Sequence, residues 1–129
     1  PAGYVRTDAD TVIEWNGTNW IVSREDEYGF DAVKGTFTRF ASGLMICTSL
    51  SYALDVTTLY DGHYISAEQT WVYPAVFAAV PMIGATNLNN TQLWATARTG
   101  STAGGAGRIW ATGIWTGRSL QMQATGLWY

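Results

Sequence analysis

The most constraining feature of the sequence is a pair of β-prone arms within residues 36–47, which flank an Ala-Ser-Gly tripeptide at 41–43. Gly43 can adopt the positive φ of a tight reversal, so the arms are predicted to pair as an antiparallel hairpin. The second arm is apolar at four consecutive positions, 44–47. Such a strand is typically covered on both faces. We therefore expect the hairpin at the centre of an all-β domain, between a core and a second sheet or another subunit.

Short β-prone segments separated by turn residues make up most of the remaining chain, and no stretch of helix length has a 3.6-residue period. Asn-Gly at 16–17 predicts a hairpin in which Trp15 and Trp20 face each other, and Asp-Gly at 61–62 predicts another turn. The prediction is an antiparallel β-sandwich of six to eight strands, preceded by a small N-terminal β-hairpin segment. Further strands are expected at 49–60, 63–74, 82–88, 93–98, 108–115 and 120–129, with a Gly-rich connection at 100–107 and a tight turn at Thr116-Gly117.

Residues 24–35 form the most polar stretch and begin with Arg-Glu-Asp-Glu, which is typical of a linker. The chain is therefore divided into an N-terminal hairpin and neck or linker segment, 1–34, and a β-sandwich domain, 35–129. No apolar run approaches the roughly 20 residues of a membrane span, so membrane insertion is not expected. The sequence starts at Pro1 without a methionine, which we interpret as a piece of a longer protein.

The composition favours an oligomer. The 129 residues are 47% hydrophobic but 13% charged, and they include seven Trp, seven Tyr and four Phe. The charged share is about half of the usual one, so part of the apolar surface is expected to be covered by copies of the same chain. The net charge of -3 argues against a nucleic-acid partner, since such sites are basic.

Two motifs of the chain are the hairpin at 37–47 and Thr-Trp-Val-Tyr-Pro-Ala-Val-Phe at 70–77 with Pro81 behind it. Together they resemble the C-terminal receptor-binding domains of bacteriophage tail fibres. The usual form of the second motif is Trp-Thr-Phe-Pro-x-x-Phe, from which Val72 and Tyr73 depart. The Gly-Leu-Trp-Tyr end at 126–129 and the aromatic–Asn-Gly-Thr–Trp hairpin at 15–20 are also similar to tail proteins.

The resemblance covers most of residues 35–129 and, more loosely, 3–23, and its motifs are structural. It implies a sandwich shared with a family of invertebrate lectins, a homotrimer, and ligand sites near the distal loops or the subunit seams. No binding residue of the family can be matched to a position in this chain.

Motifs for catalysis or metal binding are weak. His63 is the single histidine and Cys47 the single cysteine, so we expect no metal, no cofactor and a buried thiol rather than a nucleophile. Asp61, His63 and Ser66 are residue types of a catalytic triad, but real triads assemble from distant segments. Neighbouring subunits could bring Asp55, Asp61 or Glu68 together for glycoside cleavage. We predict that the chain is not an enzyme.

Sugar binding has physical support because aromatic rings stack on pyranose faces, while Arg, Asn, Gln and carboxylate groups hydrogen-bond hydroxyls. For each tryptophan, a place in the core or in a subunit interface remains the alternative. The candidate ligand-binding residues are Tyr60, His63 and Tyr64 around the Asp-Gly turn, and Trp94, Arg98, Arg108, Trp110, Trp115 and Arg118 in the last strands.

The predicted function is non-catalytic host attachment. A homotrimer at the tip of a phage tail fibre or a similar virion protein, extracellular once released, would recognise a bacterial surface glycan or an outer-membrane protein. Two alternatives stay open: a structural trimerisation or capping domain without a ligand, and a capsule depolymerase fragment.

Overall fold

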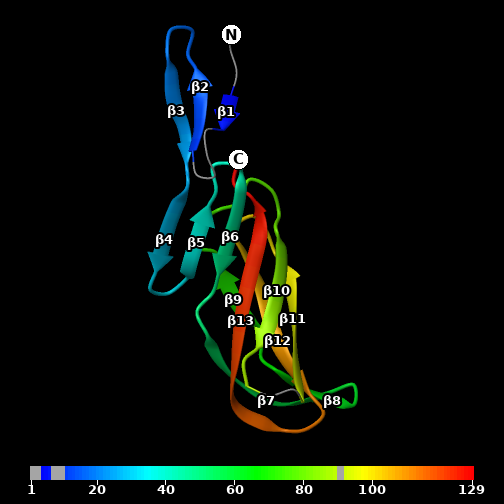
Figure 1. Ribbon diagram of the computed structural model, residues 1–129. Coiled ribbons are helices and arrows are strands. Elements are labelled where there is room, and N and C mark those ends of the chain that lie inside the picture. Colours follow the sequence, from blue (N-terminus) through cyan, green and yellow to red (C-terminus); the bar gives the residue numbers. More distant parts are fainter. Residues whose placement is uncertain (1–3, 7–10, 90–91) are drawn as a thin grey trace.

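The computed structural model describes residues 4–6, 11–89 and 92–129, and their regular elements are all β-strands in antiparallel pairs, as predicted. The strands form a three-stranded sheet and a ten-stranded sheet (Figure 1). The described residues contain no helix with the length and hydropathy needed to cross a bilayer. The small sheet consists of β1 (Tyr4–Arg6), β2 (Thr11–Trp15) and β3 (Trp20–Glu25). The large one consists of β4 (Glu27–Asp31), β5 (Gly35–Arg39), β6 (Leu44–Thr48), β7 (Tyr52–Tyr60), β8 (His63–Ser66), β9 (Gln69–Val72), β10 (Met82–Asn87), β11 (Leu93–Thr99), β12 (Gly104–Ala111) and β13 (Trp115–Leu127).

The predicted N-terminal hairpin is strands β2 and β3. Its turn is closed by Asn16, whose side-chain oxygen accepts the N–H groups of Thr18 and Asn19 at 2.9 and 2.8 Å. Trp15 and Trp20 are register partners, and their ring centroids lie 5.6 Å apart. The expected aromatic pair is therefore confirmed. Figure 1 shows this small sheet beyond the end of the main body at which the C-terminus lies.

The linker predicted at 24–35 is wrong, because residues 24–25 end β3, residues 27–31 form β4 and Gly35 begins β5. Strand β4 pairs with β5 along its whole length. The charged residues of this segment make contacts within the sheet. Glu27 is the register partner of Arg39, and the Arg39 guanidinium lies 3.0 Å from the Glu27 carboxylate in an ion pair. The Asp31 carboxylate accepts the N–H groups of Val33 and Lys34, each at 2.8 Å, which closes the turn and lowers the pKa of Asp31. The division of the chain at residue 34 stays a prediction.

The hairpin at residues 36–47 is confirmed as β5 and β6, and Gly43 has the positive φ, 104°, that the turn requires. The chain end packs on this turn. The Trp128 indole N–H donates to the carbonyl of Phe40 at 2.8 Å, and the Tyr129 hydroxyl donates to the carbonyl of Ala41 at 2.6 Å. These two bonds tie the C-terminus to the hairpin.

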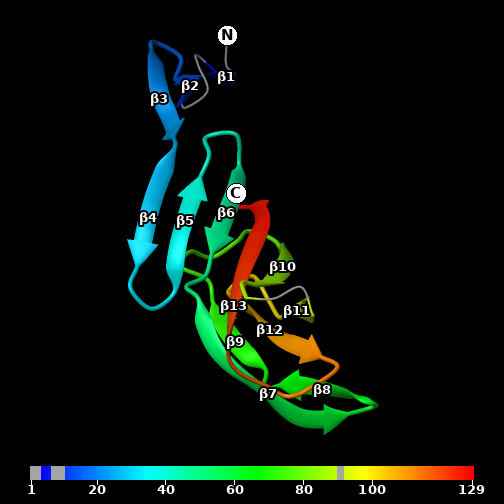
Figure 2. The same ribbon diagram turned by 60° about the horizontal axis from the view of Figure 1, so that its bottom comes forward.

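The ten-stranded sheet folds over into two layers. In the first layer β13 pairs with β6 and β10, and β6, β5 and β4 continue the sheet outward. In the second layer β12 pairs with β11 on one side and with β8 and β9 on the other. Strand β7 pairs with both β13 and β8, and so connects the layers. Figures 1 and 2 show the β7–β8 hairpin protruding at the end of the body opposite the small sheet.

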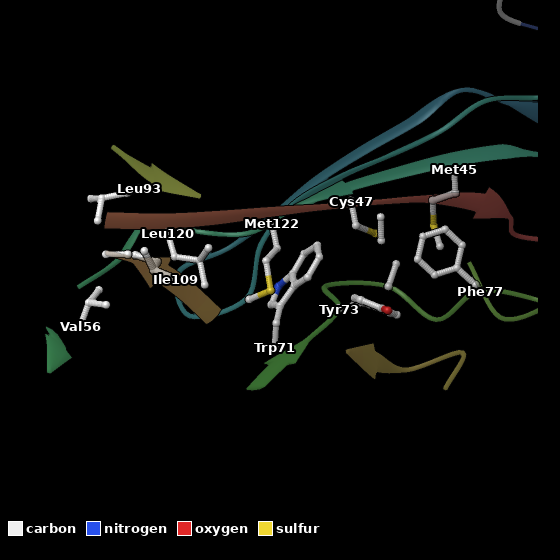
Figure 3. Packing of buried hydrophobic residues seen from close by; sticks show 13 residues of the cluster. Met45, Cys47, Val56, Trp71, Tyr73, Phe77, Leu93, Ile109, Leu120 and Met122 are labelled. Atoms are coloured by element: carbon white, nitrogen blue, oxygen red, sulfur yellow. The ribbon is translucent and has the colours of Figure 1, made fainter. Parts of the chain in front are cut away.

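The hydrophobic core lies between the two layers (Figure 3). The aromatic residues of the 70–77 motif are inside it: Trp71 and Tyr73 have ring centroids 4.9 Å apart, and Tyr73 and Phe77 5.3 Å. The Trp71 indole N–H donates to the carbonyl of Lys34 at 2.8 Å, which holds the β4–β5 turn against the core. Cys47 is buried as expected, and burial raises the pKa of its thiol to about 11.

The structure differs from the prediction in the last third of the chain. The predicted strand 108–115 is β12, which starts at Gly104 and ends at Ala111, so half of the Gly-rich connection is strand. Gly105 allows the backbones of β11 and β12 to approach closely, because a Cβ on Gly105 would lie 2.9 Å from the Arg98 carbonyl oxygen. The turn predicted at Thr116-Gly117 is a β-bulge within β13, and the chain reverses at 112–114 instead.

The main sheet also has ten strands rather than six to eight. Two features explain the difference. The presumed linker contributes β4, and the segment expected as one strand at 63–74 contains both β8 and β9.

Candidate ligand-binding site

Six of the nine candidate residues lie together on the outer face of β11 and β12 and on the adjoining β7–β8 hairpin. On these strands Trp94 is the register partner of Trp110, and Thr96 is the partner of Arg108. Residues in the same register share one face of a sheet, and the alternate residues of both strands face the core. The six residues are Tyr60, His63, Trp94, Arg98, Arg108 and Trp110.

The aromatic members form two edge-to-face pairs across the strands. The ring centroids of Tyr60 and Trp110 are 6.1 Å apart, and those of His63 and Trp94 are 5.6 Å apart. The Trp110 indole N–H donates to the Thr96 hydroxyl at 2.8 Å, which fixes the orientation of the ring. Four rings are thus held next to one another at the base of the β7–β8 turn.

The charged members are organised around Glu68. The Arg98 guanidinium makes two hydrogen bonds to the Glu68 carboxylate, of 3.0 and 2.6 Å, and the Arg108 guanidinium lies 3.5 Å from it. The hydrogen bond from Arg98 is the main cause of a lowered pKa of Glu68, and Glu68 in turn raises the pKa of Arg98. Two guanidinium groups share one carboxylate, so the cluster carries one net positive charge.

The Tyr60–Trp110 pair and the charged groups line a pocket of about 320 Å³, here named the aromatic–arginine pocket, whereas the His63–Trp94 pair lies outside its lining. Its lining residues are Tyr60, Glu68, Thr96, Ala97, Arg98, Ala106, Gly107, Arg108 and Trp110. A second depression of about 280 Å³ shares Arg98 and Ala106 with this pocket, and the two adjoining depressions together are here named the groove. The groove combines a ring wall, hydrogen-bond donors and acceptors, and a small-residue floor at Ala106, which is the usual make-up of a small-molecule site.

Three candidate residues lie elsewhere. Tyr64 and Trp115 are half-buried and pack against the core, as the alternative interpretation of such residues allowed. The Arg118 guanidinium stacks over the Trp115 ring at 4.8 Å. Trp115 and Arg118 belong to β13, which pairs with β7 and not with β12. This strand order separates the two residues from the pocket.

Sequence reasoning did not include Glu68 and Thr96 among the ligand-binding residues. Thr96 had a signal, because it alternates with Trp94 and Arg98 on one strand face. Glu68 had none, since it is 30 residues from Arg98 in the chain. Glu68 was predicted only as a possible glycosidase carboxylate, and the structure places it in an ion-pair cluster with Arg98 and Arg108. The described residues that line the pocket include one carboxylate, whereas glycoside cleavage ordinarily uses two.

The outer face of the other layer, here named the uncharged face, has a different character. Register and burial place one residue set of β4, β5, β6, β13 and β10 on it, and none of its members is Asp, Glu, Lys, Arg or His. Several are strongly exposed, including Met82 at 83% and Phe30 at 68%. A depression of about 590 Å³ on this face lacks titratable lining groups. The set comprises Tyr28, Phe30, Thr36, Thr38, Leu44, Ile46, Thr48, Met82, Gly84, Thr86, Gln121, Gln123, Thr125 and Leu127.

No family model matches the chain, and no curated protein sequence matches it significantly. Two solved structures are similar in fold. An N-truncated R1-type pyocin tail fibre has a TM-score of 0.51 and 10% sequence identity, over 78% of this chain and 85% of that one. The chain has the fold of a pyocin tail fibre. The resemblance stated from the sequence motifs is thereby confirmed for the fold.

The second similar structure is a C-terminal fragment of the P. aeruginosa R1 pyocin fibre. It has a TM-score of 0.49 and 10% sequence identity, over 78% of this chain and 28% of that fragment. The chain therefore spans less than a third of the longer fibre structure.

Proposed function

We propose that this chain is the receptor-binding module of a phage tail fibre or a related virion adhesin, and that it holds a cell-surface glycan without cleaving it. The observation that carries the proposal is the aromatic–arginine pocket on the outside of a tail-fibre fold. We place the module at the fibre tip, with the β7–β8 hairpin directed away from the particle. The small sheet, at the opposite end of the body in Figure 1, then leads toward the shaft.

The chemistry of the pocket suits a sugar. The face of a pyranose is apolar and packs on an aromatic ring, while its hydroxyl groups need donors and acceptors at the edge. Trp110 and Tyr60 offer the rings, and Arg98 and Arg108 offer charged donors. Since Thr96 already orients the Trp110 indole, little conformational freedom is lost when a sugar packs against it.

The uncharged face supports assembly into a homotrimer. Charged residues are depleted at the centre of protein interfaces, and an exposed face of this extent without charges is uncommon on a soluble monomer. We propose that copies of the chain cover this face and leave the aromatic–arginine pocket of each copy accessible. Three weak sites on one tip then act together, so the attachment is firmer than any single site allows.

The adhesion proposal is tested with fluorescently labelled protein and a panel of bacterial cells. Trp110→Ala should weaken cell binding at least about fivefold, because it removes one ring of the pocket and costs about 1 kcal/mol or more per site. Trp20→Ala is the matched control, since it removes the same ring from the small sheet. Retained binding by Trp110→Ala would contradict the site. A folded wild-type oligomer that binds no cells favours the capping alternative, and release of oligosaccharide by the protein indicates a depolymerase.

The trimer proposal is tested by light scattering. One chain has a mass of 14.1 kDa, and the wild-type particle in solution should have three times this mass. Thr125→Arg should dissociate it, because the new charge lies in the middle of the uncharged face. Thr57→Arg, on an exposed position of β7, is the control and should leave the mass unchanged. A monomeric wild-type protein would overturn the proposal.

A further inference from the structure

We propose that the aromatic–arginine pocket selects an acidic saccharide, and that a carboxylate of the sugar binds at Arg108 and competes there with Glu68. This inference rests on the proposed function and narrows its ligand class. Glu68 shows which chemistry the arginines accept: its carboxylate receives two hydrogen bonds from Arg98, in the paired geometry by which guanidinium groups bind carboxylates.

The balance of charge leaves room for a second anion. The Arg108 guanidinium lies 3.5 Å from Glu68, longer than the 2.7–2.9 Å of a typical charge-assisted hydrogen bond, and 28% of its side chain is exposed. An incoming carboxylate can therefore approach Arg108 without first displacing a close internal contact. With one net positive charge before binding, the cluster becomes neutral when the carboxylate arrives.

The surrounding elements do not oppose a negative ligand. Strands β11 and β12 carry Arg98 and Arg108 and no acidic residue. The adjoining β7–β8 hairpin carries Asp55 and Asp61, but it contributes Tyr60 and neither carboxylate to the pocket lining, and Asp55 accepts the N–H of Gly117. Glu68 is thus the one negative group among the described residues that line the pocket.

The shape of the groove indicates an oligosaccharide rather than a single sugar. The two adjoining depressions, of about 320 and 280 Å³, meet at Arg98 and Ala106. The rings of Tyr60 and Trp110 belong to the first depression, and the floor along Gly104 to the second. We infer that one sugar packs on the rings while an acidic residue of the same chain of sugars lies at the arginines.

The test uses the full chain and the surface polysaccharide purified from a bacterium in the adhesion panel. The polysaccharide is compared in three forms: native, carboxyl-reduced to its neutral equivalent, and dephosphorylated. Binding is followed by biolayer interferometry at low and high salt. Arg108→Gln should weaken binding of the native form about five- to tenfold and that of the carboxyl-reduced form less than about twofold. Lys34→Gln is the control, since it removes one positive charge outside the pocket.

Glu68→Gln gives the sharper result, because the proposal fixes the sign of its effect. Removing the competing carboxylate should tighten binding of the native form about two- to fivefold at low salt, and high salt should abolish the gain by screening. Weaker binding of native and reduced forms alike would assign Glu68 a structural role and overturn the proposal. Thermal unfolding of each variant verifies that it is folded.

The remaining outcomes separate this inference from the proposed function. Equal binding of all three forms would refute an acidic ligand and leave glycan binding intact. Loss of binding after dephosphorylation, but not after carboxyl reduction, would make the anion a phosphate and the carboxylate assignment wrong. A wild-type protein that binds none of the three forms would refute glycan binding itself.

Discussion

A buried serine gives the most specific test of how the strands of the second layer are joined. Ser66 is 2% exposed; its hydroxyl accepts the N–H of Ile109 at 3.0 Å and donates to the carbonyl of Ala67 at 2.9 Å. It lies where β12 changes partner from β8 to β9, and on this side of β12 neither strand provides a register partner for Ile109. Ser66→Ala leaves the Ile109 N–H without a partner in the core.

The magnitude follows from the burial. A buried N–H that loses its acceptor costs about 1–3 kcal/mol, and Ile109 is 0% exposed, so water cannot replace the hydroxyl. We expect the free energy of unfolding to fall by about 2 kcal/mol. For a chain of this length, 1 kcal/mol corresponds to roughly 4 °C, so the melting temperature should fall by about 8 °C.

The assay is thermal and urea unfolding followed by circular dichroism, at one fixed protein concentration because the stability of an oligomer depends on it. Ser42→Ala is the control: Ser42 is exposed in the β5–β6 turn, and its loss should change stability by less than about 0.5 kcal/mol. If Ser66→Ala behaves like this control, the Ile109 N–H has another acceptor and the account of this junction is wrong.

Three further predictions concern the core, a turn and the ion-pair cluster. The buried Cys47 thiol, whose pKa is raised to about 11, should react with a thiol reagent at about pH 8 only after denaturation; rapid labelling of the native chain would contradict the core. Gly35→Ala should lower the free energy of unfolding by more than about 2 kcal/mol in urea titrations, because Gly35 has a φ of 102° and a Cβ there would overlap the Thr48 carbonyl oxygen. Arg98 holds the pKa of Glu68 below 4.5, so the stabilisation by this pair is complete above about pH 4.5 and is lost as the pH falls through the lowered pKa. The difference in melting temperature between the wild type and Glu68→Gln should accordingly shrink toward about pH 3, and a constant difference would argue against the pair.

Turns and strand faces were predictable because they depend on residues close together in the chain. The Asn-Gly, Ala-Ser-Gly and Asp-Gly turns are all present, and each places a glycine at a positive φ. Within β13, the apolar residues Leu120 and Met122 are buried, whereas Gln121 and Gln123 lie on the opposite face, as their alternation predicts. These signals were sufficient for an all-β antiparallel fold.

The incorrect predictions of a linker, a loop and a turn have one physical origin. The same residue types occur in solvent-exposed turns and in strands that are stabilised by contacts with distant segments. Glu27 is typical of a solvated linker until Arg39 is placed opposite it. Gly105 is typical of a loop until Arg98, its close neighbour across the strands, is known. Thr116 and Gly117 form a turn in isolation and a bulge when β7 pairs on both sides of them.

The sequence by itself determined the fold class, the hairpin turns and the residue types from which a sugar site could be built. Only the tertiary structure decided which of them meet, because strand order and register depend on contacts between distant segments. That order brings Glu68 to Arg98 and Arg108, and it moves Trp115 away to the far side of β7. The residues that line a pocket on a sheet come from adjacent strands. Which strands are adjacent depends on long-range packing in the core, and not on the order of the strands in the chain.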